Sequence, residues 1–270
     1  MLLNEIATTS REVAATRSRK AKTGLLAATI SRMDSAEVAI GVSYLSGRLP
    51  QGRLGVGFAA IRDIDVSPAT EPTLTLTATD AALDEIEATT GAGSRSRRRE
   101  LLNSLMAAAT PDERDLLMGL LGGGLRQGAL DGVMAEALAV AFAAPRADVR
   151  RAAMLSGKLA AVAAALARDG SETLSGFGLT VGTAVQPMLA STAESATAAV
   201  AEFADSFVEW KVDGARLQIH RSGDTVEVFT RSLRRVTRSV PDIVEQAKTI
   251  ECAEFIIDSE AISLREAGID

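Results

Sequence analysis

The sequence has little of several residues on which particular protein classes depend. Aromatic residues make up 3% of the 270 positions, and Cys252 is the single cysteine. One cysteine excludes a disulfide within the chain and a thiolate zinc site, so we expect a reducing compartment, the cytoplasm. Cys252 itself lies in an apolar stretch typical of a strand. The scarcity of aromatics, in a chain that is 47% hydrophobic and rich in alanine, favours closely packed helices over an aromatic-rich β-sandwich.

Long apolar runs are also missing. The N-terminal MLLNEIATTSREV has acidic residues where a secretory signal peptide has about 7–15 apolar ones. The longest apolar run, residues 152–167, is interrupted by Lys158 and is shorter than the ~20 residues that cross a membrane. These two observations predict a soluble protein with no membrane partner.

Charge is unevenly distributed along the chain. The net charge of −6 gives no support for a general attraction to nucleic acid. Residues 1–53 differ from the rest, because they hold eight Lys or Arg against four acidic residues. Such a local positive excess could steer a polyanion onto this part of the chain. Solvated helix faces would explain the same residues equally well.

Residues 1 to about 170 show helical periodicity. Two helices are expected to open with a capping box, one from Asp34 to Glu37 and one from Thr110 to Glu113, the latter with Pro111 at its first position. One break is PTLTLTAT, residues 72–79, whose alternation indicates a short strand or an extended arm. Further helices are expected at about 80–89, 95–109, 131–143, 147–155 and 158–168.

The periodicity changes near residue 178. GFGLTVGTAVQPMLA reads as an extended linker, and four period-2 segments follow: FVEWKVD, ARLQIHR, TVEVFTRS and AEFIIDSEA. SGD, residues 222–224, predicts a tight hairpin, and residues 239–250 predict a helix capped by Ser239. We therefore expect a multidomain chain, with an all-helical domain at 1–178, a linker at 179–190 and an α+β segment at 191–270.

A lysine stands at the end of the first expected strand. Alternation along FVEWKV would put Glu209 and Lys211 on one face, roughly 6.5 Å apart, while Asp213 and Gly214 turn the chain and Arg216 returns to the same neighbourhood. One acid and two cations would suit a nucleotide: the acid for a base amino group or a ribose hydroxyl, the arginine for ribose or phosphate oxygens, and the lysine against a phosphorus. A surface strand with an ordinary Glu–Lys pair would give the same pattern.

Four motifs in one order resemble a known enzyme family. KVDGAR, from Lys211 to Arg216, resembles the nucleotidyl-transfer signature K-x-D-G-x-R of ATP-dependent DNA ligases and RNA capping enzymes. FTRSLRRVT, centred on Arg231, and FIIDSEAI, which presents Glu260, resemble the next ligase motifs. QPMLA, residues 186–190, is similar to the segment with which the archaeal and eukaryotic type of ligase enters its catalytic domain.

The resemblance implies a reaction for the lysine. In this family the amine, here that of Lys211, attacks the α-phosphorus of ATP, expels pyrophosphate and holds AMP as a phosphoramidate. A free lysine has a pKa of ~10.4, so desolvation, the nearby Arg216 and a bound Mg²⁺ are expected to favour the neutral amine. AMP then passes to the 5′-phosphate of a nick in duplex DNA, and the 3′-hydroxyl seals the strand. The resemblance implies nucleotide contacts from Glu209, Arg216, Arg231 and Glu260, with Glu260 also a metal ligand.

Residues 1–178 resemble the helical DNA-binding domain that precedes the ligase core, most clearly at LLGGGLRQGALDGVMAEAL, residues 120–138. A word of the form Leu-small-Gly-x-Leu occurs there and near residues 45–52 and 155–162. Chance or three similar helix C-caps would explain the repeat, and we also expect these junctions to grip DNA phosphates. The expected DNA contacts are Arg48, Arg53, Arg126, Gln127 and Lys158. RSRRRE, residues 95–100, would join them or form a solvated helix start.

Two conspicuous residues are expected to have structural roles. The single histidine, His220, is expected to be a partly exposed strand residue, and Trp210 is expected to lie in the core. Asp213 would form the turn or contact the lysine loop.

The later ligase motifs and an oligonucleotide-binding barrel are not found before Asp270. We therefore expect the N-terminal portion of a longer, monomeric enzyme: a DNA-binding domain and a truncated adenylation domain, inactive alone. An incomplete sheet is expected to expose edges and apolar surface, with poor order or self-association after about residue 190. A non-catalytic DNA-binding module and an RNA ligase or capping enzyme are the alternatives.

Overall fold

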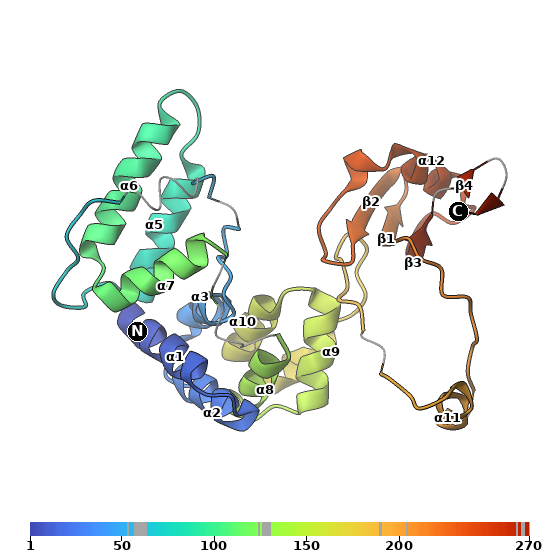
Figure 1. Ribbon diagram of the computed structural model, residues 1–270, viewed down its shortest axis with the longest axis horizontal. Helices are drawn as coiled ribbons and strands as arrows, with labels where there is room; N and C mark the ends of the chain where they lie inside the picture. Colours follow the sequence, from blue (N-terminus) through green and yellow to red (C-terminus); the bar gives the residue numbers. More distant parts are fainter. Residues whose placement is uncertain are drawn as a thin grey trace. The chain divides into compact units, whose positions relative to one another are not determined.

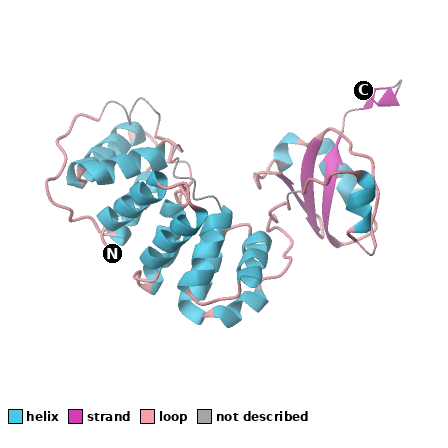
Figure 2. Cartoon of the chain, turned by 60° about the horizontal axis from the view of Figure 1, so that its bottom comes forward, coloured by secondary structure: helices cyan, strands magenta, loops and turns pink. Residues whose placement is uncertain are grey.

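The computed structural model describes residues 1–52, 54–56, 64–123, 125, 131–188, 191–203, 205–262, 264–265 and 268–269, which are called the described residues below. The chain divides into two compact units. The first, called the helical unit, comprises Met1–Ala153 and Lys158–Phe177. The second, called the sheet unit, comprises Met154–Gly157 and Gly178–Asp270. Figures 1 and 2 show helices alone in the first and all of the strands in the second.

The helices of the N-terminal region follow the predicted periodicity closely. They are α1 (Leu3–Ala15), α2 (Arg19–Ile30), α3 (Ser35–Leu45), α5 (Leu76–Ala88), α6 (Ser94–Ala108), α7 (Pro111–Leu121), α8 (Asp131–Ala141), α9 (Arg146–Ser156), α10 (Leu159–Asp169) and the 3₁₀ turn η1 (Ser171–Gly176). Both predicted capping boxes are present, Asp34 with Glu37 and Thr110 with Glu113. The prediction of an all-helical first domain is confirmed. None of the described helices is long and apolar enough to cross a membrane.

The alternating segment 72–79 is not a strand. Thr75 makes one isolated bridge to Leu2, and its hydroxyl then accepts from the backbone N–H of Ala78 as the N-cap of α5. Leu76 and Thr79 are both buried, three residues apart, so the helical period begins inside the alternating stretch. The N-cap at Thr75 and the helical spacing of the buried residues therefore decide the structure of this stretch over its period-2 pattern.

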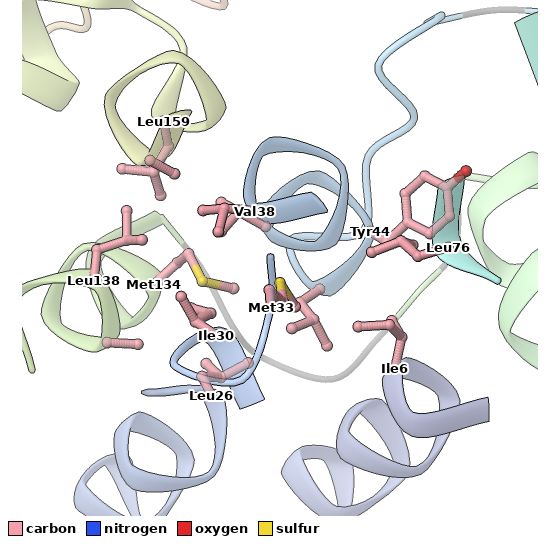
Figure 3. Close-up of a cluster of buried hydrophobic side chains, with 14 of the residues drawn as sticks. Ile6, Leu26, Ile30, Met33, Val38, Tyr44, Leu76, Met134, Leu138 and Leu159 are labelled. Atoms are coloured by element: carbon pink, nitrogen blue, oxygen red, sulfur yellow. The ribbon is translucent and has the colours of Figure 1, made fainter. Parts of the chain in front are cut away.

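The helices of this unit share one apolar core. Figure 3 shows side chains of α2, α3, α8 and α10 meeting in a common core, among them Ile30, Val38, Met134 and Leu159. Each fully buried Leu, Ile or Met side chain contributes roughly 1.5–3 kcal/mol relative to an exposed one. The core therefore gives the helical unit its own source of stability.

The repeated Leu-small-Gly word is a helix C-cap at all three places. Gly47, Gly123 and Gly157 have φ of 72°, 63° and 63°, and they follow the ends of α3, α7 and α9. Left-handed backbone at this position closes the last helical turn, and glycine adopts it without a steric cost. The recurrence of the word thus has a structural cause that requires no ligand.

The sheet unit is built around an antiparallel hairpin. Its described strands β1 (Ala215–Ser222), β2 (Thr225–Thr230) and β3 (Glu254–Ala261) form a sheet in the order β2-β1-β3, and β4 (Leu264–Arg265) pairs with β5 (Gly268–Ile269). Ser222 pairs with Thr225 across the predicted SGD turn, where Gly223 has φ of 58°. The unit also contains α11 (Ala196–Ala201), η2 (Thr237–Ser239) and α12 (Pro241–Thr249).

Helix α12 covers one face of this sheet. Leu217, Val226 and Val228 pack there against Ala247 of α12. Pro241 occupies the first position of the helix, but the N-cap is Val240 and Ser239 belongs to η2, so the predicted serine cap is wrong. Cys252 is exposed in the loop before β3 and lies outside the strand, contrary to the prediction.

A buried ion pair in the helical unit gives a test of its stability. The N-terminal ammonium of Met1 lies 2.5 Å from Oε1 of Glu37, which also accepts through Oε2 from the N–H of Asp34. The hydrogen bond to Glu37 raises the pKa of the amine. Because the folded pKa is raised, the pair stabilises the fold fully below the usual amine pKa of ~8 and loses this effect as pH rises through the folded value.

Glu37→Gln keeps an oxygen for the capping box but removes the charge. We expect it to lower the free energy of unfolding by about 2 kcal/mol near pH 7, the scale of a hydrogen bond to a charged group, in urea titrations of the chain starting at Met1. The difference in the free energy of unfolding between the variant and wild type should become smaller at about pH 10. Glu12→Gln, on the exposed face of α1, serves as the control. A difference that stays constant or grows with pH would contradict the role of the pair.

Candidate functional site

The antiparallel register gathers the predicted site elements at one end of the sheet. Arg216 of β1 lies opposite Glu260 of β3, and Leu217 lies opposite Thr230 at the end of β2. The turn that carries Arg231 directly follows β2, and the loop that carries Lys211 directly precedes β1. Three segments that are far apart in the sequence therefore meet at this end.

The candidate residues also share a face. Side chains alternate along a strand, so Arg216, Gln218 and His220 point to the side of the sheet opposite α12. Asp258 and Glu260 of β3 face the same way, because they pair with Gln218 and Arg216. The face that carries α12 is mainly apolar, whereas this second face, called the polar face below, carries most of the polar side chains.

Arg216 is held in place by Asp258. Its Nε and Nη2 donate to the two carboxylate oxygens at 3.0 and 2.5 Å, a bidentate geometry that fixes the guanidinium plane. The hydrogen bonds to Asp258 raise the pKa of Arg216 further, and Glu260 adds to the effect. Sequence reasoning missed Asp258. The available signal was its spacing two residues before Glu260, which places both carboxylates on one face of a strand.

The lysine loop is tied to β3 at Gly214. The N–H of Gly214 donates to Oε1 of Glu260 at 3.0 Å. A Cβ on Gly214 would lie 2.3 Å from the carbonyl oxygen of Ala261, so a side chain there would push the loop off the strand. The glycine of the KVDGAR motif thus allows the close approach that brings the lysine loop to Glu260.

The predicted strand at residues 207–213 is not formed. The segment belongs to no described strand, and the N–H of Val212 donates back to the carbonyl oxygen of Trp210 at 3.0 Å. An extended segment needs a neighbouring strand to share its backbone hydrogen bonds, and none is present beside it within the described part of the chain. Trp210 is 93% exposed, so the prediction that it lies in the core is wrong.

The functional side chains of this segment face solvent. The side chain of Lys211 is 87% exposed, and Nζ lies 3.5 Å from Oδ1 of Asp213. Glu209 is also exposed. The prediction that Lys211 is desolvated is therefore wrong for this structure, because no strand seats its segment against the sheet. The structure brings together Arg216, Glu260 and the end of the lysine loop, while Glu209 and the lysine amine remain outside.

His220 is fully buried, which corrects the prediction of partial exposure. Residues 182–185 lie over the polar face: Gly182 N–H donates to Nδ1 of His220 at 3.0 Å, and Val185 N–H donates to Oε1 of Gln218 at 2.9 Å. Burial lowers the pKa of His220, and Glu227 partly opposes this shift. The predicted linker is thus packed on the sheet at these residues.

The carboxylates at this end of the sheet could supply one ligand to a magnesium ion, with the other ligands coming from substrate and water. The described residues contain no group of three or more Asp, Glu, His or Cys side chains that could enclose a metal. Asp258 is engaged by Arg216, which leaves Glu260 as the carboxylate beside the lysine loop. Mg²⁺ is commonly held by one or two carboxylates together with substrate phosphates and water. Glu260 fits such a role.

The predicted DNA contacts are only partly described. Arg48 pairs with Asp131 at 3.0 Å, at the first residue of α8, and Lys158 is exposed at the N-cap of α10. Gly47 lies against Leu125, so the junction after α3 approaches the segment after α7. Arg53, Arg126 and Gln127 lie outside the described residues. In the RSRRRE segment, at the start of α6, Arg97 pairs with Glu85 of α5.

Comparisons with known proteins cover both units. A family model described as DNA ligase N terminus matches residues 52–139, and one described as ATP dependent DNA ligase domain matches residues 187–268. The chain is 48% identical over 268 residues to a protein of Saccharopolyspora erythraea named "Probable DNA ligase", covering 99% of this chain and 52% of that protein. Proteins of the same name from Rhodococcus jostii and Streptomyces avermitilis are 48% and 49% identical over 269 and 268 residues, covering 99% of this chain and 54% and 52% of theirs. The chain spans about half the length of the curated relatives it matches.

The exposure of the lysine segment can be read from fluorescence, because Trp210 is the single tryptophan. We expect emission typical of a water-exposed indole and quenching by acrylamide that approaches that of free tryptophan. Free N-acetyltryptophanamide provides the reference, and urea-unfolded chain provides the control. A blue-shifted, poorly quenched emission would mean that residues 207–212 are packed against the sheet.

Proposed function

This chain belongs to the family of ATP-dependent DNA ligases, and we propose on that basis that it supplies the AMP-accepting lysine and a DNA-binding unit to an enzyme that seals nicks in duplex DNA. The observation that carries this proposal is the pairing of Arg216 with Glu260, with Gly214 of the lysine loop bonded to Glu260. It brings the lysine loop, a cation and an acid to one end of a sheet, as a nucleotide requires.

Lys211 is the proposed nucleophile. Its Nζ forms a bond to the α-phosphorus of ATP, the bond from that phosphorus to the pyrophosphate oxygen breaks, and the neutral amine loses one of its two protons, so that the phosphoramidate nitrogen keeps the other. An amine attacks only in its neutral form. A nucleotide seated over the loop would remove water from the exposed amine.

The other predicted residues are assigned to binding. Arg216, held flat by Asp258, and Arg231 would donate to ribose or phosphate oxygens, and Glu209 and Glu260 would accept from the base or the ribose hydroxyls. Glu260 would also hold Mg²⁺, which when bound offsets the charge of the phosphates. AMP would then be passed to the 5′-phosphate of the nick, where the 3′-hydroxyl displaces it.

The helical unit would hold the duplex by its phosphates. Arg48 and Lys158 are exposed on it, and Arg53, Arg126 and Gln127 are the further candidates. Contacts of this kind position a protein on DNA without reading its sequence, as an enzyme that acts at any nick requires.

A non-catalytic DNA-binding role is the second candidate. It is favoured by the separate core of the helical unit and by the 87% exposure of Lys211. An RNA ligase or capping enzyme is disfavoured, because the helical region matches the ligase N-terminal model and the relatives named above carry the name DNA ligase.

The test of the main proposal uses a chimera that joins residues 1–270 to the remaining part of the Saccharopolyspora erythraea relative. With [α-³²P]ATP and Mg²⁺, we expect acid-labile label on the chimera and sealing of a nicked duplex. Lys211→Ala should lower both by more than about a thousandfold, because the nucleophile is lost. The 270-residue chain alone should be labelled poorly, since its lysine is exposed.

Lys248→Ala is the matched control, because this lysine lies in the same unit on α12 and pairs with Glu245 of the same helix. It should leave labelling within about twofold of the parent. A Lys211→Ala chimera that is still labelled would refute the assignment. Labelling without sealing would limit the proposal to the first step.

DNA binding by the helical unit is tested through its salt dependence. Arg48→Gln removes one charge and should reduce the slope of log affinity against log salt by about one. Arg168→Gln on α10, where the arginine is paired with the adjacent Asp169, is the control and should leave the slope unchanged. Equal slopes for Arg48→Gln and wild type, measured on a nicked duplex, would exclude a phosphate contact at this position.

A further inference from the structure

The segment Gly182–Val185 is held on the sheet by two side chains of β1. Gln218 and His220 both point to the polar face and both are buried. Each binds backbone atoms of the segment that lies over them. These two side chains with residues 182–185 are called the clasp below.

Gln218 makes the stronger half of the clasp. Its Oε1 accepts from the N–H of Val185 at 2.9 Å, and its Nε2 donates to the carbonyl oxygen of the same residue at 2.5 Å. Both backbone groups of Val185 are thereby paired, much as a neighbouring strand would pair them. An amide side chain keeps this arrangement at any ordinary pH, because it does not titrate.

His220 makes the other half, and its contribution depends on its protonation state. A backbone N–H can only donate, so Nδ1 accepts from Gly182 and the ring proton of the neutral form lies on Nε2. Among the described residues Nε2 is buried without a hydrogen-bond partner. A protonated ring would place a second donor against the N–H of Gly182, so this bond exists only while the ring is neutral.

Burial opposes the protonated ring of His220 more strongly than the carboxylate of Glu227 favours it. Glu227 of β2 lies opposite it, but Oε1 of this carboxylate is paired with Arg235 at 2.5 Å. β3 presents the apolar Ile256 opposite His220, and Phe229 of β2 packs edge-on at 5.0 Å.

The neighbouring titratable groups lie farther along the face. Asp258 lies opposite Gln218 in the register and its carboxylate is engaged by Arg216, and Glu254 lies opposite Ser222. Residues 182–185 carry no titratable side chain. Burial accordingly lowers the pKa of His220, which keeps the ring neutral near pH 7.

We propose that Gln218 and His220 form a clasp in which the bond from Gly182 to His220 breaks in acid while the bonds between Val185 and Gln218 remain. The start of the segment that leads to Lys211 is then held less firmly on the sheet as the pH falls. The clasp and the bond from Gly214 to Glu260 pin both ends of residues 186–213 to the same face of the sheet. Gln218 and Arg216 are two residues apart on β1, about 6.5 Å along the strand. The inference stands on the sheet unit alone and is independent of the proposed ligase activity.

The sign of the pH effect follows from burial. Since the folded pKa of His220 is lowered, the unfolded or opened state binds the proton more tightly. The bond from Gly182 to His220 therefore stabilises the closed clasp above the ordinary histidine pKa of ~6.5, and this stabilisation is lost as the pH falls towards the folded value.

Amide hydrogen exchange, measured by NMR on the 270-residue chain, reports separately on the bond of Gly182 to His220 and the bond of Val185 to Gln218. Between about pH 8 and about pH 5, after correction for intrinsic exchange, protection of the Gly182 amide should fall at least about tenfold and that of Val185 should change less than about threefold. In His220→Asn, whose Oδ1 can replace Nδ1 as acceptor without titrating, Gly182 protection should not vary with pH. Gln218→Met should remove Val185 protection at both pH values.

Three results would overturn the proposal. They are a Gly182 protection that does not depend on pH in wild type, a joint loss at Gly182 and Val185, and a pH dependence that persists in His220→Asn. The wild-type comparison of the two amides decides the question even where a variant fails to fold.

Discussion

The candidate site depends on the antiparallel pairing of β1 with β3. This pairing sets Arg216 opposite Glu260, and the bond from Gly214 to Glu260 then brings the lysine loop to the same end of the sheet. A shift of one residue in register would turn either set of side chains to the face covered by α12. The apolar packing of Leu217, Val226 and Val228 against α12 therefore fixes the position of polar groups on the opposite face.

Much of the architecture follows from local sequence signals. Capping boxes at Asp34 and Thr110 and the turn at Gly223 were predictable, because they depend on residues three or fewer positions apart. The absence of a described strand at residues 207–213 was not predictable, because a strand requires a neighbouring strand and the alternation of side chains does not reveal whether one is present. Burial of His220 was also unpredictable, since it results from a segment almost 40 residues earlier in the chain.

The sequence predicted several residues of the candidate site, but it predicted their positions only in part. The motifs identified Arg216 and Glu260, and the structure places them opposite one another. Asp258 was missed although its spacing was visible, and Lys211 is exposed where a pocket was expected. The expected apolar surface is confirmed by Phe203, Phe207 and Trp210, which are all exposed and precede the lysine in the sequence. Poor order or self-association after residue 190 stays a prediction.

The central claim is that the end of the sheet around Gly214, Arg216 and Glu260 receives a nucleotide. The most direct measurement is an NMR titration of the ¹⁵N-labelled 270-residue chain with ATP and Mg²⁺. The account predicts the largest shifts at the Gly214 amide, which donates to Glu260, and at the Arg216 Nε–H, which donates to Asp258. Shifts confined to the helical unit, or none at Gly214 and Arg216 at saturating ATP, would contradict it.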